Sequence, residues 1–322
     1  MRALVAHSQT DVRLDDDASL APEGEVVLDV AYSSLNYKDA LAVTSRGRIV
    51  RRFPTILGID IAGTVVSCTT EEFKEGDQVV GIAHGLGESD GGGYAEQQRV
   101  RAETLVPLAD GLDLDLAMAV GTAGVTAMLC VMALERNGLT PDGREVAVTG
   151  AAGGVGSIAV MLLARAGYRV VASTGRPEQE PYLRSLGASA IIHRDELSKK
   201  GGPLQSERWA GAVDTVGGDT LVNLVAQTAY EGSVASCGMA GGADIQTAVW
   251  PFILRNVSIL GVSTNKPSKE SRIAAWARLA KDLDLDKLRE LRRIEPLSKI
   301  RELSEEILAG QTRGRVVIDV KS

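Results

Sequence analysis

Cysteine and histidine are both scarce in this chain of 322 residues, which contains three of each. The cysteines, Cys68, Cys130 and Cys237, lie far apart and are odd in number. They cannot form a disulfide framework or a CxxC-type zinc site. The pattern fits a reducing compartment, and we therefore expect a cytoplasmic protein without a bound metal.

The sequence also shows no basic excess, no leader and no membrane span. Its formal net charge is −7, whereas general nucleic-acid binding needs a basic field. Residues 1–7 reach polar positions too early for a signal peptide. We find no uninterrupted apolar stretch long enough to cross a bilayer. We therefore expect a small-molecule ligand, not nucleic acid or a membrane, and a local positive pocket can still hold an anion.

Glycine is abundant, with 35 residues, and the first hundred positions consist of short strands and turns. Residues 25–32, 63–66 and 77–82 mix β-branched and polar residues and are bounded by glycines or charged turns. The only helical segment expected there covers residues 37–43. This pattern predicts an antiparallel, barrel-like β domain.

The pattern changes near Asp113, where residues 114–135 become rich in Ala, Met and Leu. Gly121-Thr122-Ala123-Gly124 interrupts this stretch, so we predict two helices. Strands and helices then alternate, which predicts right-handed βαβ crossovers and a parallel sheet. The predicted strands cover residues 145–149, 169–173, 190–193, 212–215 and 232–237, and the helices cover residues 154–166, 178–186 and 219–229.

The last part of the chain returns to helices and one strand. Two helices are expected at residues 269–282 and 297–308. A final strand is expected at residues 314–320, and we predict that it joins the first domain.

A glycine-rich turn, Gly150-Ala151-Ala152-Gly153-Gly154-Val155-Gly156, lies between a predicted strand and a predicted helix. This context is the one that a dinucleotide fingerprint requires. Gly153 and Gly154 let the backbone approach a pyrophosphate, and Gly156 lets the helix pack close to the strand. Ala151 stands where the usual first glycine is expected. A glycine-rich turn without a nucleotide is the alternative.

The end of the second strand of this domain indicates which nucleotide is bound. NAD sites place a carboxylate there, but this chain has Ser173-Thr174-Gly175-Arg176. Hydroxyls and a guanidinium suit a 2′-phosphate, which favours NADPH. Arg194, after the third strand, is a second candidate, unless it forms a surface salt bridge with Asp195 or Glu196.

Taken together, these motifs resemble the zinc-free quinone oxidoreductase branch of the medium-chain dehydrogenase/reductase superfamily. The resemblance covers the full length. Asn36-Tyr37-Lys38-Asp39 together with residues 121–129 is similar to the acrylyl-CoA reductase group, which uses NADPH to reduce the double bond of acrylyl-CoA. The family resemblance implies a GroES-like β-barrel catalytic domain (residues 1–118 and 264–322) and a doubly wound Rossmann domain (residues 119–263) that forms homodimers.

The resemblance also assigns cofactor contacts residue by residue. They fall on Tyr37, Ala152, Gly153, Gly154, Val155, Thr174, Gly175, Arg176, Arg194, Met239, Ile253, Thr264 and Gln311. Zinc-dependent relatives carry Cys and His ligands. Here Asn36, Tyr37 and Asp39 occupy the early segment, and His84 has no thiolate nearby, so the resemblance implies no metal.

Reduction of an activated alkene needs a hydride, a stabilised oxyanion and a proton. Tyr37 is the candidate for positioning the nicotinamide and the substrate, and Asn36 and Asp39 could orient their neighbours. A core aromatic and a helix cap by Asn36 are the alternatives. Thr122 and Thr126 could cap a helix or touch the nicotinamide.

Four arginines, Arg46, Arg48, Arg51 and Arg52, lie in one loop before Pro54. We expect Arg51 and Arg52 to bind the phosphates of coenzyme A, unless the loop is only a solvated surface. Two rival functions remain open at this point. One is an NADPH-dependent quinone oxidoreductase, and the other is a non-catalytic NADPH-binding protein.

Overall fold

The computed structural model describes residues 1–322 and divides the chain into two compact units. The barrel unit comprises Met1–Val125, Thr264–Ala280 and Leu285–Ser322. The parallel-sheet unit comprises Thr126–Ser263 and Lys281–Asp284. The first unit is therefore discontinuous in sequence, whereas nearly all of the second is one uninterrupted segment.

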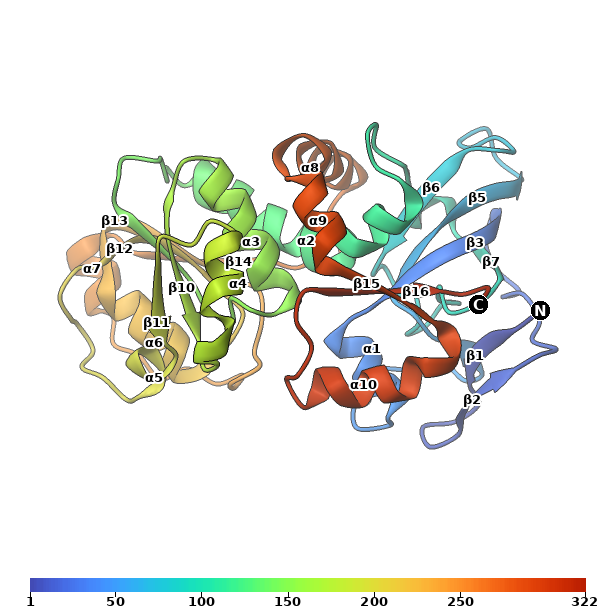
Figure 1. The fold of residues 1–322 in the computed structure, drawn as a ribbon, viewed down its shortest axis with the longest axis horizontal. Coiled ribbons are helices and arrows are strands. Elements are labelled where there is room, and N and C mark those ends of the chain that lie inside the picture. The colour runs from blue at the N-terminus through green and yellow to red at the C-terminus, as the bar shows by residue number, and fades with distance from the viewer. The chain divides into compact units, whose positions relative to one another are not determined.

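The barrel unit contains two sheets (Figure 1). The larger has the order β15-β16-β3-β5-β6-β8, with β7 also paired to β3, and every pairing except β15–β16 is antiparallel. Its strands are β3 (Val26–Leu35), β5 (Asp60–Cys68), β6 (Gln78–Ile82), β7 (Gln97–Val100), β8 (Leu105–Pro107), β15 (Arg292–Pro296) and β16 (Arg315–Asp319). The smaller antiparallel sheet contains β2 (Val12–Asp15), β1 (Ala3–Ala6) and β4 (Thr55–Ile56), in that order.

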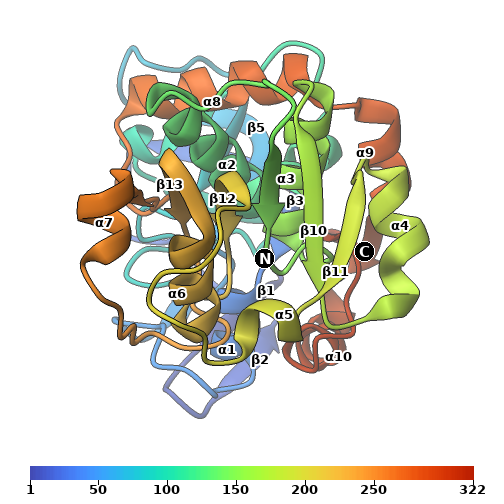
Figure 2. The same ribbon diagram turned by 90° about the vertical axis from the view of Figure 1, so that its left-hand side faces the viewer.

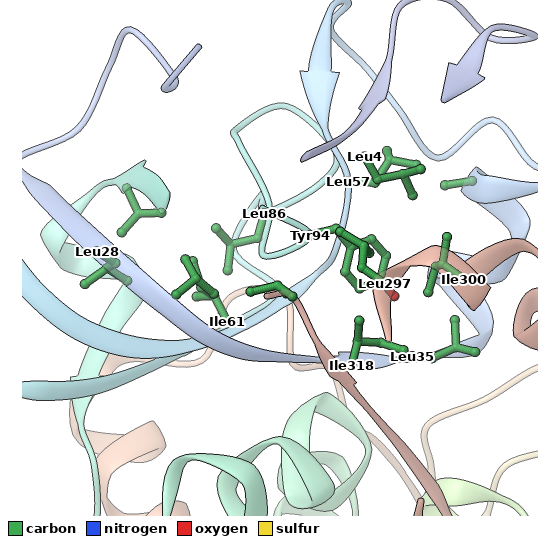
Figure 3. Packing of buried hydrophobic residues seen from close by; sticks show 14 of the residues in the cluster. Leu4, Leu28, Leu35, Leu57, Ile61, Leu86, Tyr94, Leu297, Ile300 and Ile318 are labelled. Atoms are coloured by element: carbon green, nitrogen blue, oxygen red, sulfur yellow. The ribbon is translucent and has the colours of Figure 1, made fainter. Parts of the chain in front are cut away.

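An apolar core fills the barrel unit because its strands and helices each turn one apolar face inward. Figure 3 shows Leu28, Ile61, Leu86, Tyr94 and Ile318 from this core. Helix α1 packs against α10, so the start of the chain and its end share this core. The helices of this part are α1 (Tyr37–Val43), α8 (Lys269–Asp282), α9 (Leu285–Leu291) and α10 (Ile300–Leu308), with short 3₁₀ turns at Ala102–Thr104 and Leu297–Lys299.

Helix α2 (Leu114–Arg136) corrects one sequence expectation and confirms another. By length and composition this helix is apolar enough to cross a membrane, so the prediction that the chain has no apolar stretch of that length was wrong. Its most apolar part is 83% buried inside the protein, which is typical of a core helix. Gly121 has non-helical torsion angles (φ 50°, ψ −159°), so the two predicted helices are confirmed as two segments joined at a kink.

The parallel-sheet unit is a six-stranded parallel sheet with the order β11-β10-β9-β12-β13-β14 (Figure 2). Numbered within this unit, the order is 3-2-1-4-5-6, which is the doubly wound Rossmann arrangement. The order reverses between β9 and β12. The strands are β9 (Glu145–Val148), β10 (Arg169–Thr174), β11 (Ala190–His193), β12 (Trp209–Asp214), β13 (Thr228–Ser236) and β14 (Ser258–Gly261).

Helices connect these strands and pack on them. Helix α3 contacts β9 and β10, and α6 contacts β12 and β13. Buried Trp209, Leu224 and Val234 belong to the core between α6 and the sheet. The helices are α3 (Gly154–Arg165), α4 (Glu180–Ser185), α5 (Asp195–Ser198), α6 (Gly218–Gln227) and α7 (Trp250–Arg255).

The fold class predicted from the sequence is confirmed, and the differences lie in short elements. The last strand does join the first unit, because β16 pairs with β3. Strands β1, β2 and β15 and helix α9 were not predicted, since runs of four to seven residues carry too little periodicity. Strand β13 begins at Thr228 instead of residue 232, and the Thr228 hydroxyl donates to the Leu224 carbonyl oxygen (2.7 Å), which closes the preceding helix.

Candidate functional site

The carboxyl ends of the parallel strands gather most of the predicted cofactor residues at one edge of the parallel-sheet unit. The glycine-rich turn follows β9, Thr174-Gly175-Arg176 ends β10, and Arg194 follows β11. Met239 follows β13, and its side chain is 71% exposed. Nucleotides bind at such an edge in open α/β sheets.

The glycine-rich turn is tight because two of its glycines have no room for a side chain. Gly150 has a positive φ of 57°, and a Cβ there would lie 2.3 Å from the Thr215 hydroxyl oxygen. A Cβ on Gly156 would lie 2.3 Å from the Gly150 carbonyl oxygen. Gly150 therefore takes the left-handed position, which explains why Ala151 is tolerated where a glycine was expected. Both Ala151 and Ala152 are buried.

The start of α3 is open to an anion. Its N-cap residue is Gly153, which has no side chain to accept from the first N–H groups of the helix. These N–H groups and the positive end of the helix dipole suit a pyrophosphate. Gly153, Gly154 and Val155 form this open helix start.

Two arginines at the ends of β10 and β11 have no acidic partner. Arg176 is half-buried and Arg194 is exposed. A Cβ on Gly175 would lie 2.5 Å from Cδ and Nε of Arg194, so the absence of a side chain at Gly175 makes room for this guanidinium. The arginines and the Thr174 hydroxyl form a cationic, hydrogen-bonding corner next to the glycine-rich turn.

Arg194 forms no salt bridge with Asp195 or Glu196, which was the alternative role for this residue. The carboxylate of Asp195 lies 3.5 Å from His193, and that of Glu196 lies 3.2 Å from Arg208. Both neighbouring acids therefore have other partners, and the Arg194 guanidinium remains available to an anion.

A buried carboxylate stabilises this edge of the sheet between β9 and β12, where the strand order reverses. Asp214, at the end of β12, accepts from the Thr149 hydroxyl (2.7 Å) and from the backbone N–H of Gly217 (2.9 Å). Thr149 Oγ1 in turn accepts from the Thr215 N–H (3.0 Å). Burial raises the pKa of Asp214, against the effect of these donors. The pair Thr149 and Asp214 thus joins the residues after β9 to those after β12.

In the barrel unit, the three predicted catalytic residues divide into one exposed and two buried side chains. Tyr37 begins α1 and is 52% exposed, whereas Asn36 is 7% exposed and Asp39 is 1% exposed. The Asn36 N–H and its side-chain amide both donate to Oδ2 of Asp39 (2.9 and 3.1 Å). Asn36 and Asp39 therefore form the cap of α1 and position Tyr37 at its start.

Asp60, at the start of β5, is the centre of a buried polar network that holds this cap. One of its carboxylate oxygens accepts from Ser34 Oγ, Asn36 Nδ2 (2.9 Å) and the Thr122 N–H (2.9 Å). The other accepts from the Thr122 hydroxyl (2.5 Å). Thr122, which the sequence left undecided between two roles, is thus held by Asp60.

Arg315 of β16 provides the positive charge of this network. Its Nη2 donates to Ser34 Oγ (3.1 Å) and Asn36 Oδ1 (3.2 Å), and its Nε donates to the Ala119 carbonyl oxygen (2.8 Å). Burial lowers the pKa of Arg315, opposed by the nearby carboxylates. One buried guanidinium thus lies beside two buried carboxylic acids.

The pKa of the second carboxyl group, that of Asp39, is raised in this environment. Burial raises the pKa of Asp39 to about 7, and the charge of Asp60 acts in the same direction. Hydrogen bonds from Asn36 and from the Ile59 N–H (2.9 Å) oppose this rise. Protonation of Asp39 therefore occurs near neutral pH.

The remaining predicted residues are more dispersed. Arg51 and Arg52 are exposed, and their guanidinium groups lie 3.5 Å from Glu88 and 3.4 Å from Glu23. Lys38 Nζ donates to the same Glu88 (2.8 Å), so this carboxylate joins the loop to α1. The other predicted positions are Ile253, 67% exposed on α7, Thr264, buried in the barrel unit, and Gln311, exposed after α10.

The donor set does not fit a zinc ion. No group of three or more His, Cys, Asp or Glu side chains is arranged to hold a metal. Asn36 and Thr122, the polar side chains around Asp60, already donate to that carboxylate.

Sequence reasoning missed Asp60, Arg315 and Asp214 as parts of the site. A signal was present for the first two, since each is a charged residue at the start of a strand whose next three residues are apolar or small. Such a residue needs a buried partner of opposite charge. The sequence could not show that the two are partners across the unit.

The raised pKa of Asp39 predicts an unusual pH dependence of stability. The folded protein binds this proton more tightly than the unfolded chain, whose aspartate pKa is about 3.9. This contribution to the free energy of unfolding is therefore complete below about pH 4 and is lost as the pH rises to about 7. Asp39→Asn, which cannot titrate, should be less stable than wild type at pH 5 because its amide has one acceptor oxygen, whereas N–H donors lie at both oxygens of Asp39.

The difference in stability between wild type and Asp39→Asn should therefore narrow between pH 5 and pH 8, by on the order of 1–3 kcal/mol. Urea unfolding at a series of pH values measures it. The exposed Asp16→Asn variant is the control and should run parallel to wild type. A constant difference across this range would show that Asp39 does not titrate in the folded protein.

Comparison with known proteins places both units in one family. Residues 22–110 match the alcohol dehydrogenase GroES-like domain, and residues 154–281 match the zinc-binding dehydrogenase domain, although the zinc ligands are not present here. The acrylyl-CoA reductase AcuI of Ruegeria pomeroyi is 51% identical over 302 residues, covering 94% of this chain and 92% of that protein. Quinone oxidoreductase-like protein 2 of Bos taurus is 30% identical and covers 74% of this chain and 67% of its own length.

Solved structures agree over nearly the whole chain. The yhdH oxidoreductase of Salmonella enterica in complex with NADP has a TM-score of 0.95 and 45% identity, with 99% of both chains covered. The yhfP protein of Bacillus subtilis with NAD bound has a TM-score of 0.94 and 44% identity, with 99% and 98% covered. This chain is therefore an oxidoreductase of the medium-chain dehydrogenase/reductase superfamily and belongs to its zinc-free, acrylyl-CoA reductase-like group.

Proposed function

We propose that this chain uses NADPH to reduce the carbon–carbon double bond of acrylyl-CoA, giving propionyl-CoA. The observation that carries the cofactor assignment is the pair Arg176 and Arg194, which has no acidic partner at the ends of β10 and β11. The substrate assignment is supported by the 51% identity to an acrylyl-CoA reductase over 94% of the chain.

The residues of the parallel-sheet unit fit NADPH at three points. The open start of α3, from Gly153 to Val155, suits the pyrophosphate. Arg176, Arg194 and the Thr174 hydroxyl suit the 2′-phosphate, and β10 ends without the carboxylate that would bind the free ribose hydroxyls of NADH. The further contacts in this proposal are Tyr37, Met239, Ile253, Thr264 and Gln311.

The proposed chemistry adds a hydride at the β-carbon and a proton at the α-carbon of the thioester. When bound, the nicotinamide supplies the hydride. Between the two additions the thioester oxygen carries negative charge, and the hydroxyl of Tyr37 donates a hydrogen bond to it. Asn36 and Asp39 are positioning residues, because they are buried and hold the start of α1.

Two exposed arginines extend the proposal to the coenzyme A part of the substrate. The ion pairs of Arg51 and Arg52 are 3.5 and 3.4 Å long and involve side chains that are 75% and 60% exposed. Exposed pairs of this kind are weak and are easily exchanged for a phosphate.

A homodimer belongs to the same proposal. Strand β14 lies at the edge of its sheet, and the neighbouring helix α7 exposes Trp250 and Leu254. An open edge next to exposed apolar side chains supports association of two copies through this unit.

Quinone reduction is the second candidate, because the bovine relative is named quinone oxidoreductase-like. Parallel turnover assays with acrylyl-CoA, crotonyl-CoA and a soluble quinone separate the two. We expect kcat/KM to be highest for acrylyl-CoA with NADPH. A higher value for the quinone would replace the proposal, and NADPH binding without turnover of any substrate would favour a non-catalytic protein.

The cofactor assignment predicts a selective effect of removing the arginines. Arg176→Ala and Arg194→Ala should each raise KM for NADPH about tenfold or more, since each removes charge-assisted hydrogen bonds to the 2′-phosphate. KM for NADH, which lacks this phosphate, should change little. Arg165→Ala, on the exposed end of α3, is the control. Equal effects on the two cofactors would remove the 2′-phosphate role.

The arginine loop predicts a selective effect on the substrate. Charge reversal in the double variant Arg51→Glu, Arg52→Glu should raise KM for acrylyl-CoA, about tenfold or more, and spare a small quinone. The double variant Arg136→Glu, Arg165→Glu changes the net charge equally on the other unit and serves as the control. If both substrates respond equally, the loop does not bind the phosphates.

A further inference from the structure

A cavity of about 490 Å³ in the barrel unit shares only Arg52 with the residues assigned a function so far. All of its lining residues belong to the barrel unit. Residues 17–23 form one wall and residues 52–56 another. Its volume lies in the range of small-molecule sites.

The cavity combines buried apolar side chains with a partly exposed aromatic ring. Val5, Ile56 and Leu86 line it and are almost fully buried. Phe53 lines it as well and is 39% exposed, although an aromatic side chain gains by leaving water. This part of the cavity therefore suits a flat, weakly polar group.

Arg99 of β7 gives the cavity an unpaired positive charge. Of the three arginines that line the cavity, Arg52 lies 3.4 Å from Glu23 and Arg101 lies 2.7 Å from Asp90. Arg99 is half-buried and has no acidic partner. A guanidinium in this position is suited to a phosphate group, which it can bind through two parallel hydrogen bonds.

The remaining polar groups of the cavity include carboxylates and hydroxyls. Asp15, Glu23 and Asp90 are already ion-paired, Asp17 has no cationic partner, and the hydroxyls of Ser19 and Ser89 can both donate and accept. A fatty acid would leave Asp17 without a donor, and an inorganic anion would leave the apolar side chains uncovered. A purine nucleotide matches all three parts, since it has a flat ring, amine and hydroxyl donors, and a phosphate.

The cavity begins next to the residues that the proposed function uses. Lys38, adjacent to Tyr37, donates to Glu88 (2.8 Å), and the Arg51 N–H donates to the Glu88 carbonyl oxygen (2.7 Å). Ser89, the next residue, already lines the cavity. The Lys38–Glu88 ion pair therefore connects the start of α1 to the residue that precedes Ser89 of the cavity wall, in the same unit.

We propose that this cavity binds the adenosine 3′-phosphate end of the CoA thioester, with the 3′-phosphate on Arg99 and the purine beside Phe53. The inference rests on the proposed function, because it requires a CoA thioester as the substrate. It adds a site for the nucleotide end of coenzyme A to the proposed phosphate contacts of Arg51 and Arg52. The predicted consequence is that the nucleotide contributes to substrate affinity.

The test compares acrylyl-CoA with acrylyl-pantetheine, which carries the same reacting group without the nucleotide. In wild type, KM should be lower for acrylyl-CoA than for acrylyl-pantetheine. Arg99→Gln and Phe53→Ala should each raise the KM for acrylyl-CoA divided by the KM for acrylyl-pantetheine. For Arg99→Gln this quotient should rise about tenfold. Lys74→Gln, on an exposed loop of the same unit, is the charge-matched control and should not alter the ratio. An unchanged ratio in both cavity variants would overturn the inference.

A binding measurement separates this inference from the proposed function. Calorimetry with adenosine 3′,5′-bisphosphate, at saturating NADP⁺ to occupy the cofactor site, should show binding to wild type and weaker binding to Arg99→Gln. If this holds while no CoA thioester is reduced, the proposed function fails and the cavity remains a nucleotide site. If acrylyl-CoA is reduced while the bisphosphate does not bind, the cavity inference fails alone.

Discussion

The hydrogen bonds that the buried carboxylate of Asp60 accepts are the interactions on which the position of Tyr37 in the barrel unit depends. Its donors come from the end of β3 (Ser34), from the cap of α1 (Asn36) and from the kink of α2 (Thr122). A buried carboxylate without these donors would cost several kcal/mol. The network therefore fixes three segments together, and Tyr37 is presented to solvent from a helix start that cannot easily shift.

The parallel-sheet unit also contains a buried acidic side chain that accepts several hydrogen bonds. There the buried carboxylate of Asp214 and the hydroxyl of Thr149 connect the residues after β9 with those after β12, where the strand order reverses. Both glycines of the turn that lack room for a side chain, Gly150 and Gly156, lie within this connection. In each unit a fully buried carboxyl group keeps more exposed groups in place, which is the usual requirement for a preorganised site.

The sequence was sufficient for features that depend on local pattern. The alternation of strands and helices and the glycine-rich turn were predicted and are confirmed. It was not sufficient for features that depend on distant partners. Whether Asn36 and Asp39 face solvent is decided by Asp60, Ile59 and Arg315, up to 279 residues away. The availability of Arg194 depends equally on Arg208, which takes the neighbouring Glu196.

The position of Arg315, C-terminal to the other members of the Asp60 network, has a consequence for biosynthesis. The parallel-sheet unit is almost entirely one continuous segment and can fold while the ribosome is still adding the remainder. The barrel unit cannot, because β3 lacks its neighbour β16, and Asp60 and Asp39 lack their counter-ion, until β16 has been synthesised. A nascent chain that has reached β14 therefore holds all six strands of the parallel sheet, while the larger sheet of the barrel unit still lacks β15 and β16.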